Sequence, residues 1–411
     1  MSRSGLVGVA LLGLVLVGSG AAAAPPPDRL EPGGTPVLMY NTDIGVGFGA
    51  LGALARFRPG CPPPFCWRVE VLAMASAREA PGGGLELPYH DDYIRLDLPG
   101  LAGGRLRLNV TLGFGRYLTS GYYGLGNASA VDEQALEARP RHHQYDRIYP
   151  QLEVRGRLSL LPHLQLMIGG SLTYNWINLY EGSQLAREAQ SGDPRLRDLL
   201  RGAERHGVAE LLLGWIWDSR DHDYAPSRGG FHEISWRACP GLSTAGDLAY
   251  GGLNLTARQF WPLWRRRLVL AARLMTDLLL GQPPFYELAR HGGLVPRSAI
   301  GGKDAVRGVP QERYHGKVKL LGNLELRARL LPFAVRRQRF VLGAVLFVDS
   351  GRVWADYSDS ERFDGEGLGL KVGAGGGLRL RWGETFILRG DVAYSPDADP
   401  VGVYVDVNHV F

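Results

Sequence analysis

Apolar and polar side chains alternate along most of this chain with the period of two residues that is typical of a β-strand. At residues 401–411 one face carries valines and ends in His409 and Phe411, while the other face carries smaller or polar residues. At residues 322–330 one face carries asparagine, glutamate and two arginines, and the other carries leucine and alanine. Such a strand separates two environments, either a protein core and solvent or lipid and a polar lumen.

Segments of this kind recur sixteen times. They lie at roughly 36–41, 44–57, 67–77, 90–99, 104–118, 143–159, 164–179, 207–218, 229–238, 248–260, 266–280, 314–330, 339–354, 367–381, 385–395 and 401–411. Short connections near 99–104, 158–164, 260–266 and 381–385 alternate with long ones near 119–142, 180–206, 281–313 and 355–366. Outer-membrane barrels sort their connections in this way, with short periplasmic turns and long outer loops. We therefore predict an all-β fold, a 16-stranded transmembrane antiparallel β-barrel.

Glycine occupies much of one strand face. Residues 367–377 carry it at five of the six positions where neighbouring strands place polar side chains. Glycine weakens a strand and often marks the close approach of another backbone. We predict that another segment of the chain packs against this face from inside the sheet.

The first 24 residues have the layout of a secretory signal peptide, with one basic residue, an apolar run and a small-residue end at Ala24. The apolar run is shorter than the ~20 residues of a membrane-spanning helix. We expect a signal peptide at 1–24, a short N-terminal linker at 25–35 and the barrel over 36–411. The net charge of +5 is small for 411 residues and decides little between function classes. No nucleic-acid partner is expected.

Two of the three cysteines, Cys61 and Cys66, bracket the sequence CPPPFC, and Cys239 is left over. In an exported protein a local disulfide between Cys61 and Cys66 is plausible, and the alternative is two thiols that never pair. A lone pair of cysteines without a companion pair is not a zinc site.

Two further patterns concern the ends of the barrel. Residues 184–207 have helix-forming composition broken by Gly192 and Pro194, so this loop forms either a short helix over the outer mouth or no regular structure. Six tryptophans fall near predicted strand ends, where the aromatic girdles of a membrane barrel lie. They are Trp215, Trp217, Trp261, Trp264, Trp354 and Trp382.

Several stretches are similar to motifs for catalysis or cofactor binding, but the residues around them do not fit those motifs. The sequence GGKDAVRGVP at 301–310 is not a phosphate-binding loop, because Asp304 stands where the hydroxyl residue should follow the lysine. The acidic and histidine side chains at 218–223 could ligate a hard cation, but side-chain caps of a turn are the commoner role. No serine and histidine pair suggests a nucleophile. We expect no enzyme activity, no metal and no cofactor.

The chain resembles the BamA/TamA-type outer-membrane assembly family, also called the bacterial surface antigen family. The matching stretches are YYGLGN at 122–127, DSRDHDYAPSRGG at 218–230, PFYELARHGG at 284–293, VRG at 306–308, FVDSGRVW at 347–354 and the aromatic residue Phe411. Each stretch alone is weak, but together they follow the family's order along the chain.

The resemblance implies that the sixth outer loop folds back into the lumen and carries Arg307 and Gly308 of the VRG motif. In this family the arginine pairs with carboxylates on the two following strands, which by position are Glu325 and Asp349. The alternation of residues 322–330 independently turns Glu325 to the polar face. The resemblance also makes Phe411 the assembly signal through which the outer-membrane assembly machinery recognises this barrel.

The sequence departs from the family at two points. Val309 replaces the aromatic residue that usually follows VRG, which predicts looser packing of the loop. The segment ahead of the barrel is too short for the periplasmic POTRA domains that protein-assembling members carry, so recruitment of clients would need a separate partner.

The resemblance implies a protein of the bacterial outer membrane that takes part in protein insertion into, or translocation across, that membrane. Expected partners are outer-membrane lipid and lipopolysaccharide, the assembly machinery for its own insertion, and a protein client. Two alternatives remain open. They are a channel or porin-like barrel with the loop as its constriction, and a structural or surface-interaction barrel.

Overall fold

The computed structural model describes residues 28–61, 65–241, 244, 248–264, 267–335, 338–358, 360–383, 386–398 and 401–411. Sixteen long strands form the wall. They are β1 (Arg29–Asn41), β2 (Gly45–Phe57), β3 (Trp67–Glu79), β5 (Tyr89–Gly100), β6 (Leu106–Gly121), β7 (Gln144–Leu161), β8 (Leu164–Leu179), β9 (His206–Asp218), β10 (Gly229–Cys239), β11 (Tyr250–Trp264), β12 (Leu268–Gly281), β15 (Val318–Val335), β16 (Gln338–Trp354), β17 (Lys371–Trp382), β18 (Phe386–Tyr394) and β19 (Gly402–Val407). The expected signal peptide, residues 1–24, lies outside the described residues.

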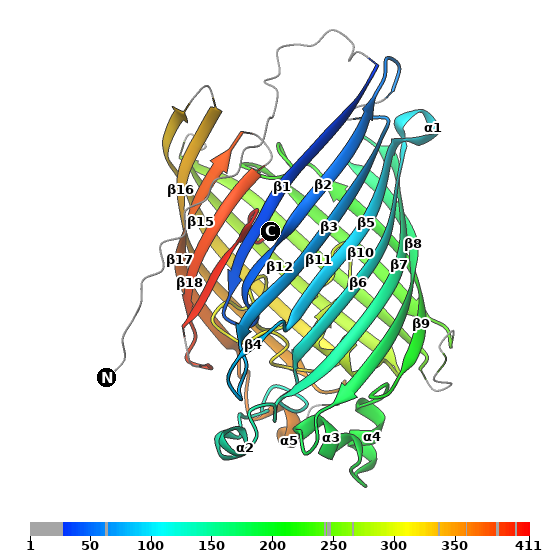
Figure 1. Ribbon diagram of the computed structural model, residues 1–411, viewed down its shortest axis with the longest axis vertical. Helices are drawn as coiled ribbons and strands as arrows, with labels where there is room; N and C mark the ends of the chain where they lie inside the picture. The colour runs from blue at the N-terminus through cyan, green and yellow to red at the C-terminus, as the bar shows by residue number, and fades with distance from the viewer. Residues whose placement is uncertain are drawn as a thin grey trace.

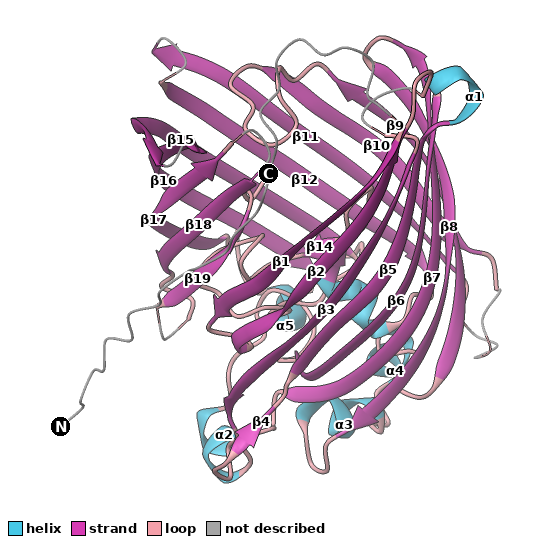
Figure 2. Cartoon of the chain, turned by 45° about the horizontal axis from the view of Figure 1, so that its top comes forward, coloured by secondary structure: helices cyan, strands magenta, loops and turns pink. Residues whose placement is uncertain are grey.

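The strands form a closed antiparallel barrel in which each strand pairs with its neighbours along the chain and β19 pairs with β1 (Figures 1 and 2). The sixteen predicted segments all correspond to wall strands, which confirms the fold. The short strand β4 (Leu85–Glu86) pairs with the end of β3. Within the described part of the chain, no helix is both long and apolar enough to cross a membrane.

Side chains on the wall alternate between lipid and lumen. On β15 and β16 the outward residues Leu324 and Leu346 are 48% and 65% exposed, while the inward residues Asn323 and Glu325 are buried. Trp215 and Trp264 are exposed near the ends of their strands, as an aromatic girdle requires. The inner surface of the barrel is therefore charged and the outer surface apolar.

Helices lie in the long outer loops, at the lower end of the barrel in Figure 1. They are α2 (Glu133–Ala138), α3 (Gln184–Ala189), α4 (Pro194–Leu199) and α5 (Glu361–Asp364), and a one-turn element α1 (Leu101–Gly104) lies at the opposite end. The loop at 184–207 thus forms two helices, because Ser183 and Asp193 each accept a hydrogen bond from a free backbone amide in the first turn. Apolar side chains of these loops pack together across the outer mouth.

Several strand boundaries differ from the sequence prediction, those of β1, β17 and β19 among them. β1 begins at Arg29 and pairs with β2 along its whole length, so residues 29–35 belong to the wall and not to a linker. β17 begins only at Lys371, because Gly367 and Gly369 adopt positive φ angles of 63° and 46° that do not fit a strand.

The last strand is also shorter than predicted. β19 ends at Val407, and Asn408 turns the chain with a positive φ of 65°. The residues beyond it enter the lumen (Figure 1), where the ring of Phe411 lies 6.3 Å from that of Phe260 on β11. The predicted lipid-facing position of His409 and Phe411 was therefore wrong, because the alternation cannot reveal a turn at Asn408.

Candidate functional site

The candidate site is the long loop between β12 and β15, residues 282–317, which we call the lumen loop. It contains a short 3-10 helix, η1 (Phe285–Ala289), and two short strands, β13 (Arg290–His291) and β14 (Arg297–Ser298), that pair with each other. Most of its residues from 285 to 292 and from 299 to 309 are buried, although it is an outer loop by its position in the chain. The loop therefore folds back into the barrel.

Arg307 lies at the centre of the loop tip and is fully buried among three carboxylates of the wall. Its Nε and Nη2 donate to the two carboxylate oxygens of Asp349 at 2.7 and 2.9 Å. Its Nη1 lies 2.9 Å from Glu325 Oε1 and 3.2 Å from Asp391 Oδ2. The guanidinium also covers the ring of Phe347 at 3.3 Å, a cation–π contact.

The structure thus brings together the four residues expected from the sequence, Arg307 and Gly308 in the loop with Glu325 on β15 and Asp349 on β16. It adds Asp391 on β18, which sequence reasoning missed. The signal for Asp391 was available, because alternation along β18 places this carboxylate on the inward face. Nothing in the local pattern indicates that the loop would reach a strand so far along the chain.

The charges around Arg307 hold it ionised. Burial alone would lower its pKa, but the carboxylates of Asp349 and Glu325 outweigh burial and raise the pKa of Arg307 above its ordinary value. A planar guanidinium can serve several carboxylates at once, which an ammonium group cannot do with the same geometry. The contact is therefore a permanent ionic anchor at neutral pH.

Two glycines make room for the loop tip. Gly308 has a φ of 93°, a conformation that side chains rarely tolerate, and its amide donates to the Tyr404 hydroxyl at 3.1 Å. A Cβ atom at Gly373 on β17 would lie 2.0 Å from the carbonyl oxygen of Arg307. The glycine face predicted to admit another segment does so at this position.

An apolar collar surrounds the tip. Val306 and Val309 are fully buried and pack in one cluster with Met275, Leu321 and Val353 of the wall. Val309 is fully buried in this cluster, and looser packing than with an aromatic residue at this position stays a prediction.

A second ionic anchor holds the first part of the lumen loop, and sequence reasoning did not find it. Arg237 on β10 donates two hydrogen bonds to Asp277 on β12, at 2.8 and 2.9 Å, and Lys319 Nζ on β15 lies 3.0 Å from the same carboxylate. Asp277 accepts a hydrogen bond from the backbone amide of Gly292, and Lys319 Nζ donates a hydrogen bond to the carbonyl oxygen of Glu287. The wall thus grips the loop backbone at a separate place from the Arg307 anchor.

The loop tip also contacts the strand that closes the barrel. Lys303 forms an ion pair with Asp406 on β19, next to the hydrogen bond between Gly308 and Tyr404. The closure itself is short. Among the described residues, β1 pairs with β19 only through Tyr40 with Val405 and Asn41 with Tyr404, and we call this junction the seam.

Residues just after the tip contact the other side of the seam. The amide of Gln311 donates to Asp43 Oδ1 at 3.1 Å, and Asp43 lies in the outer turn between β1 and β2. Burial raises the pKa of Asp43 to about 6, against the opposing effects of the Gln311 hydrogen bond and Arg78. Burial also raises the pKa of Glu312 to about 7, against the charge of Arg147. The lumen loop therefore bridges the two sides of the seam, and one of the bridging groups, Asp43, has its pKa raised to about 6.

The remaining predicted sites lie away from the loop. Cys61 and Cys66 form a disulfide in the turn between β2 and β3, at the end of the barrel that carries the short turns, and Cys239 is buried on β10 outside this disulfide. No cluster of described residues could hold a metal ion. In the turn at 218–230, Asp221 instead accepts hydrogen bonds from the backbone of Ser227 and Arg228.

Comparison with known proteins agrees with this architecture. The model of the Omp85 superfamily domain matches residues 105–403, a range that includes the lumen loop and its carboxylates. No curated protein matches the chain. The crystal structure of BamA from Haemophilus ducreyi lacking POTRA domains 1–3 matches with a TM-score of 0.56 and 14% identity, over 93% of this chain and 70% of that one. CdiB from Escherichia coli matches with a TM-score of 0.57 and 15% identity, over 96% and 67%. At these identities the two structures share the fold, and the match to the family model over more than half of the sequence identifies the chain as a member of the Omp85 superfamily of outer-membrane β-barrels.

Proposed function

We propose that this barrel inserts polypeptides into the bacterial outer membrane or moves them across it, with the seam as the opening and the lumen loop as its control. The observation that carries the proposal is that one loop holds both sides of the seam. It contacts Tyr404 and Asp406 on β19 and, through Gln311, Asp43 beside β1. Movement of the lumen loop would therefore change its contacts with both sides of the seam.

The seam itself is suited to opening. Within the described residues β1 pairs with β2 from Arg29 to Asn41, whereas its other edge pairs with β19 only at Tyr40 and Asn41. A strand edge in lipid is costly because its backbone groups have no water to bond. Such an edge can be satisfied by a strand of another polypeptide. A client strand would thus gain hydrogen bonds at the place where the barrel has fewest.

The proposal is tested by measuring how fast a client β-barrel folds into liposomes. Proteoliposomes that contain this protein should accelerate folding of an unfolded outer-membrane barrel relative to empty liposomes of the same lipid. A steady single-channel current without acceleration would instead favour a channel, for which the charged inner wall is the supporting feature. If the protein shows neither accelerated folding nor a current, a surface-interaction role for the outer loops remains.

Partners follow from the same proposal. Outer-membrane lipid and lipopolysaccharide would contact the apolar wall, and a protein client would meet the seam. We further propose that the assembly machinery recognises Phe411 before the barrel closes, since the folded chain encloses this residue in the lumen. We expect no catalytic activity.

A further inference from the structure

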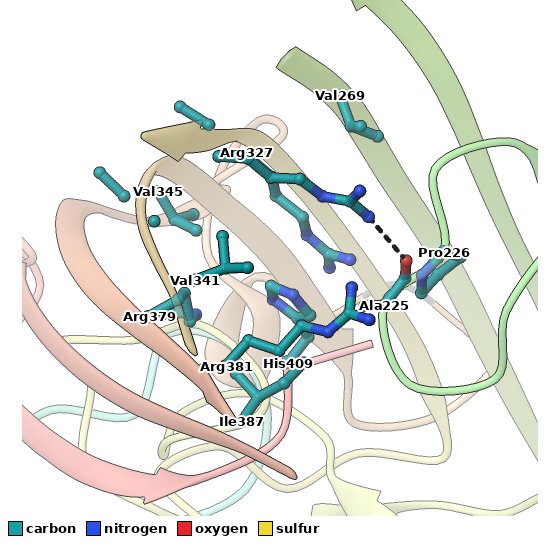
Figure 3. A pocket seen from close by; sticks show the side chains of 14 residues that line it. Ala225, Pro226, Val269, Arg327, Val341, Val345, Arg379, Arg381, Ile387 and His409 are labelled. Carbon is teal, nitrogen blue, oxygen red and sulfur yellow. Dashed lines mark hydrogen bonds between the residues drawn. The ribbon is translucent and has the colours of Figure 1, made fainter. Parts of the chain in front are cut away.

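An arginine-lined cavity lies inside the barrel at the end that carries the short turns, which we take as periplasmic. It encloses about 50 Å³ and is lined by residues of β12, β15, β16, β17 and β18 together with the turn at 225–226. Its polar lining consists of Arg327, Arg329, Arg379, Arg381 and His409 (Figure 3). None of the described residues that line it is acidic. The ionisable side chains that face the cavity are therefore basic, and the carboxylates of Glu325 and Asp391 that pair with Arg327 and Arg379 lie behind them.

Two of these arginines carry buried donors with no partner in the described protein. Arg327 and Arg379 are 6% and 4% exposed, and Arg327 Nη1 and Arg379 Nε donate to no described protein atom. Nδ1 of His409, on the same cavity, is likewise buried without a partner. A buried charged donor left without an acceptor is costly, so such atoms indicate a place for an anionic group.

The geometry and lining indicate the chemical class of that group. Guanidinium groups recognise carboxylates and phosphates, the oxyanions that match their planar donors. The rest of the lining is apolar and includes Val269, Val345 and Ile387, which suits an anion attached to a hydrocarbon stem. We propose that this cavity binds the carboxylate of a glutamate or aspartate in a polypeptide segment that enters the lumen from the periplasmic side.

The entrance to the cavity supports access from that side. Arg329 is exposed, and its Nη2 donates to the carbonyl oxygen of Ala225 at 3.4 Å. Arg381 is half-buried, and its Nε donates to the carbonyl oxygen of Gly383 in the turn between β17 and β18. Both side chains lie near the rim of the barrel, where a peptide can reach them.

The cavity is also coupled to the loop anchor. Glu325 Oε2 accepts a hydrogen bond from Arg327 Nε at 2.8 Å, and its other oxygen, Oε1, forms an ion pair with Arg307. Asp391 is shared in the same way between Arg379 and Arg307. Without Arg307, Arg327 and Arg379 alone would balance the charges of Glu325 and Asp391, which would leave less positive charge for an anion in the cavity. Arg307→Ala should therefore weaken binding of an anion in the cavity.

Direct binding tests the inference without lipid or client. The purified full chain in detergent is titrated with a blocked pentapeptide that contains two glutamates among leucines, and with the same peptide in which glutamine replaces glutamate. We expect the glutamate peptide to bind at least about tenfold more tightly, the range for a hydrogen bond to a charged group. Arg329→Gln and Arg381→Gln should each weaken it by about tenfold.

Controls separate the cavity from general electrostatics. Arg362→Gln changes an exposed arginine on α5 at the opposite end of the barrel and should leave peptide binding unchanged. Thermal unfolding of each variant reports whether the barrel is intact, and the single rim variants provide two independent tests. Inorganic phosphate should displace the glutamate peptide if both occupy one oxyanion site.

Three results would overturn the inference. Equal binding of the two peptides would show that the cavity does not recognise a carboxylate. Unchanged binding in both Arg329→Gln and Arg381→Gln would show the same. Binding of phosphate without binding of the glutamate peptide would show that the ligand is not a polypeptide carboxylate. Because the assay measures binding alone, its outcome is independent of whether the protein accelerates client folding.

Discussion

Replacing Arg307 with alanine should release the tip of the lumen loop but not its first part. The ion pairs of Glu325 with Arg327, at 2.8 Å, and of Asp391 with Arg379 do not involve Arg307 and should remain in the variant. Asp349 is left with the amide of Asn323 at 2.8 Å as its side-chain hydrogen-bond donor among the described residues. Truncating one partner of a buried charge pair typically costs ~3–5 kcal/mol, and the remaining contacts place this case at the lower end.

A cost of ~3 kcal/mol corresponds to about a 100-fold rise in the population of the released tip. Hydrogen–deuterium exchange of the protein in nanodiscs should therefore show faster exchange at residues 299–310. Residues 285–292 should stay protected, because the anchor at Arg237 and Asp277 does not involve Arg307. Arg362→Ala serves as the matched control, because its side chain is 60% exposed and its ion pair lies outside the barrel.

A second substitution separates charge from packing. Asp349→Asn in the Arg307→Ala background removes the uncompensated charge, so the double variant should recover part of the lost protection. Unchanged exchange of the tip in Arg307→Ala would refute the ionic anchor. Release of the whole loop as one unit would refute the existence of two separate anchors.

Three further predictions concern other parts of the structure. Gly373→Val should displace the loop tip and raise its exchange rate, because the new Cβ would meet a carbonyl oxygen at 2.0 Å, whereas Gly390→Ala on the next strand, with no atom within 4 Å of its Cβ, should not. The raised pKa of Asp43 means that the folded protein holds this proton more tightly than the unfolded chain, so Tm should fall as pH rises from about 4 through 6, and Asp43→Asn should flatten this slope. A Tm of the wild type that rises over this range relative to the variant would contradict the assignment. Replacing Cys61 and Cys66 with serine should lower the free energy of unfolding in urea by about 2 kcal/mol, as expected for a short closed loop, and no change would show that the disulfide adds no stability.

The wall of the barrel was predictable because lipid and lumen impose opposite demands on successive residues of each strand. Glu325 shows how far this reasoning reaches, since alternation alone turned it inward and the structure buries it there. The strand ends were less predictable, because a single backbone conformation decides them. The positive φ at Asn408 ends β19 and redirects Phe411, although the alternation of side chains continues past it.

The site was predictable only in part, for a similar reason. The resemblance supplied Arg307 with two carboxylates, but the third, Asp391, depends on where the folded loop lies across the lumen. The anchor of Arg237, Asp277 and Lys319 depends on strands that are distant in sequence and adjacent in the barrel. Inward charges can be read from each strand separately, whereas their pairing requires the closed wall.

The most direct test of the proposed function is to close the seam covalently. Tyr40 and Val405 face each other across it, so Tyr40→Cys with Val405→Cys can form a disulfide, and Leu324→Cys with Val348→Cys gives a matched pair between β15 and β16. Client folding in proteoliposomes should be accelerated by the reduced seam variant, lost on oxidation and restored by reductant, while the control pair stays active in both states. Equal acceleration by the oxidised and reduced seam variants would contradict a function that works through this opening.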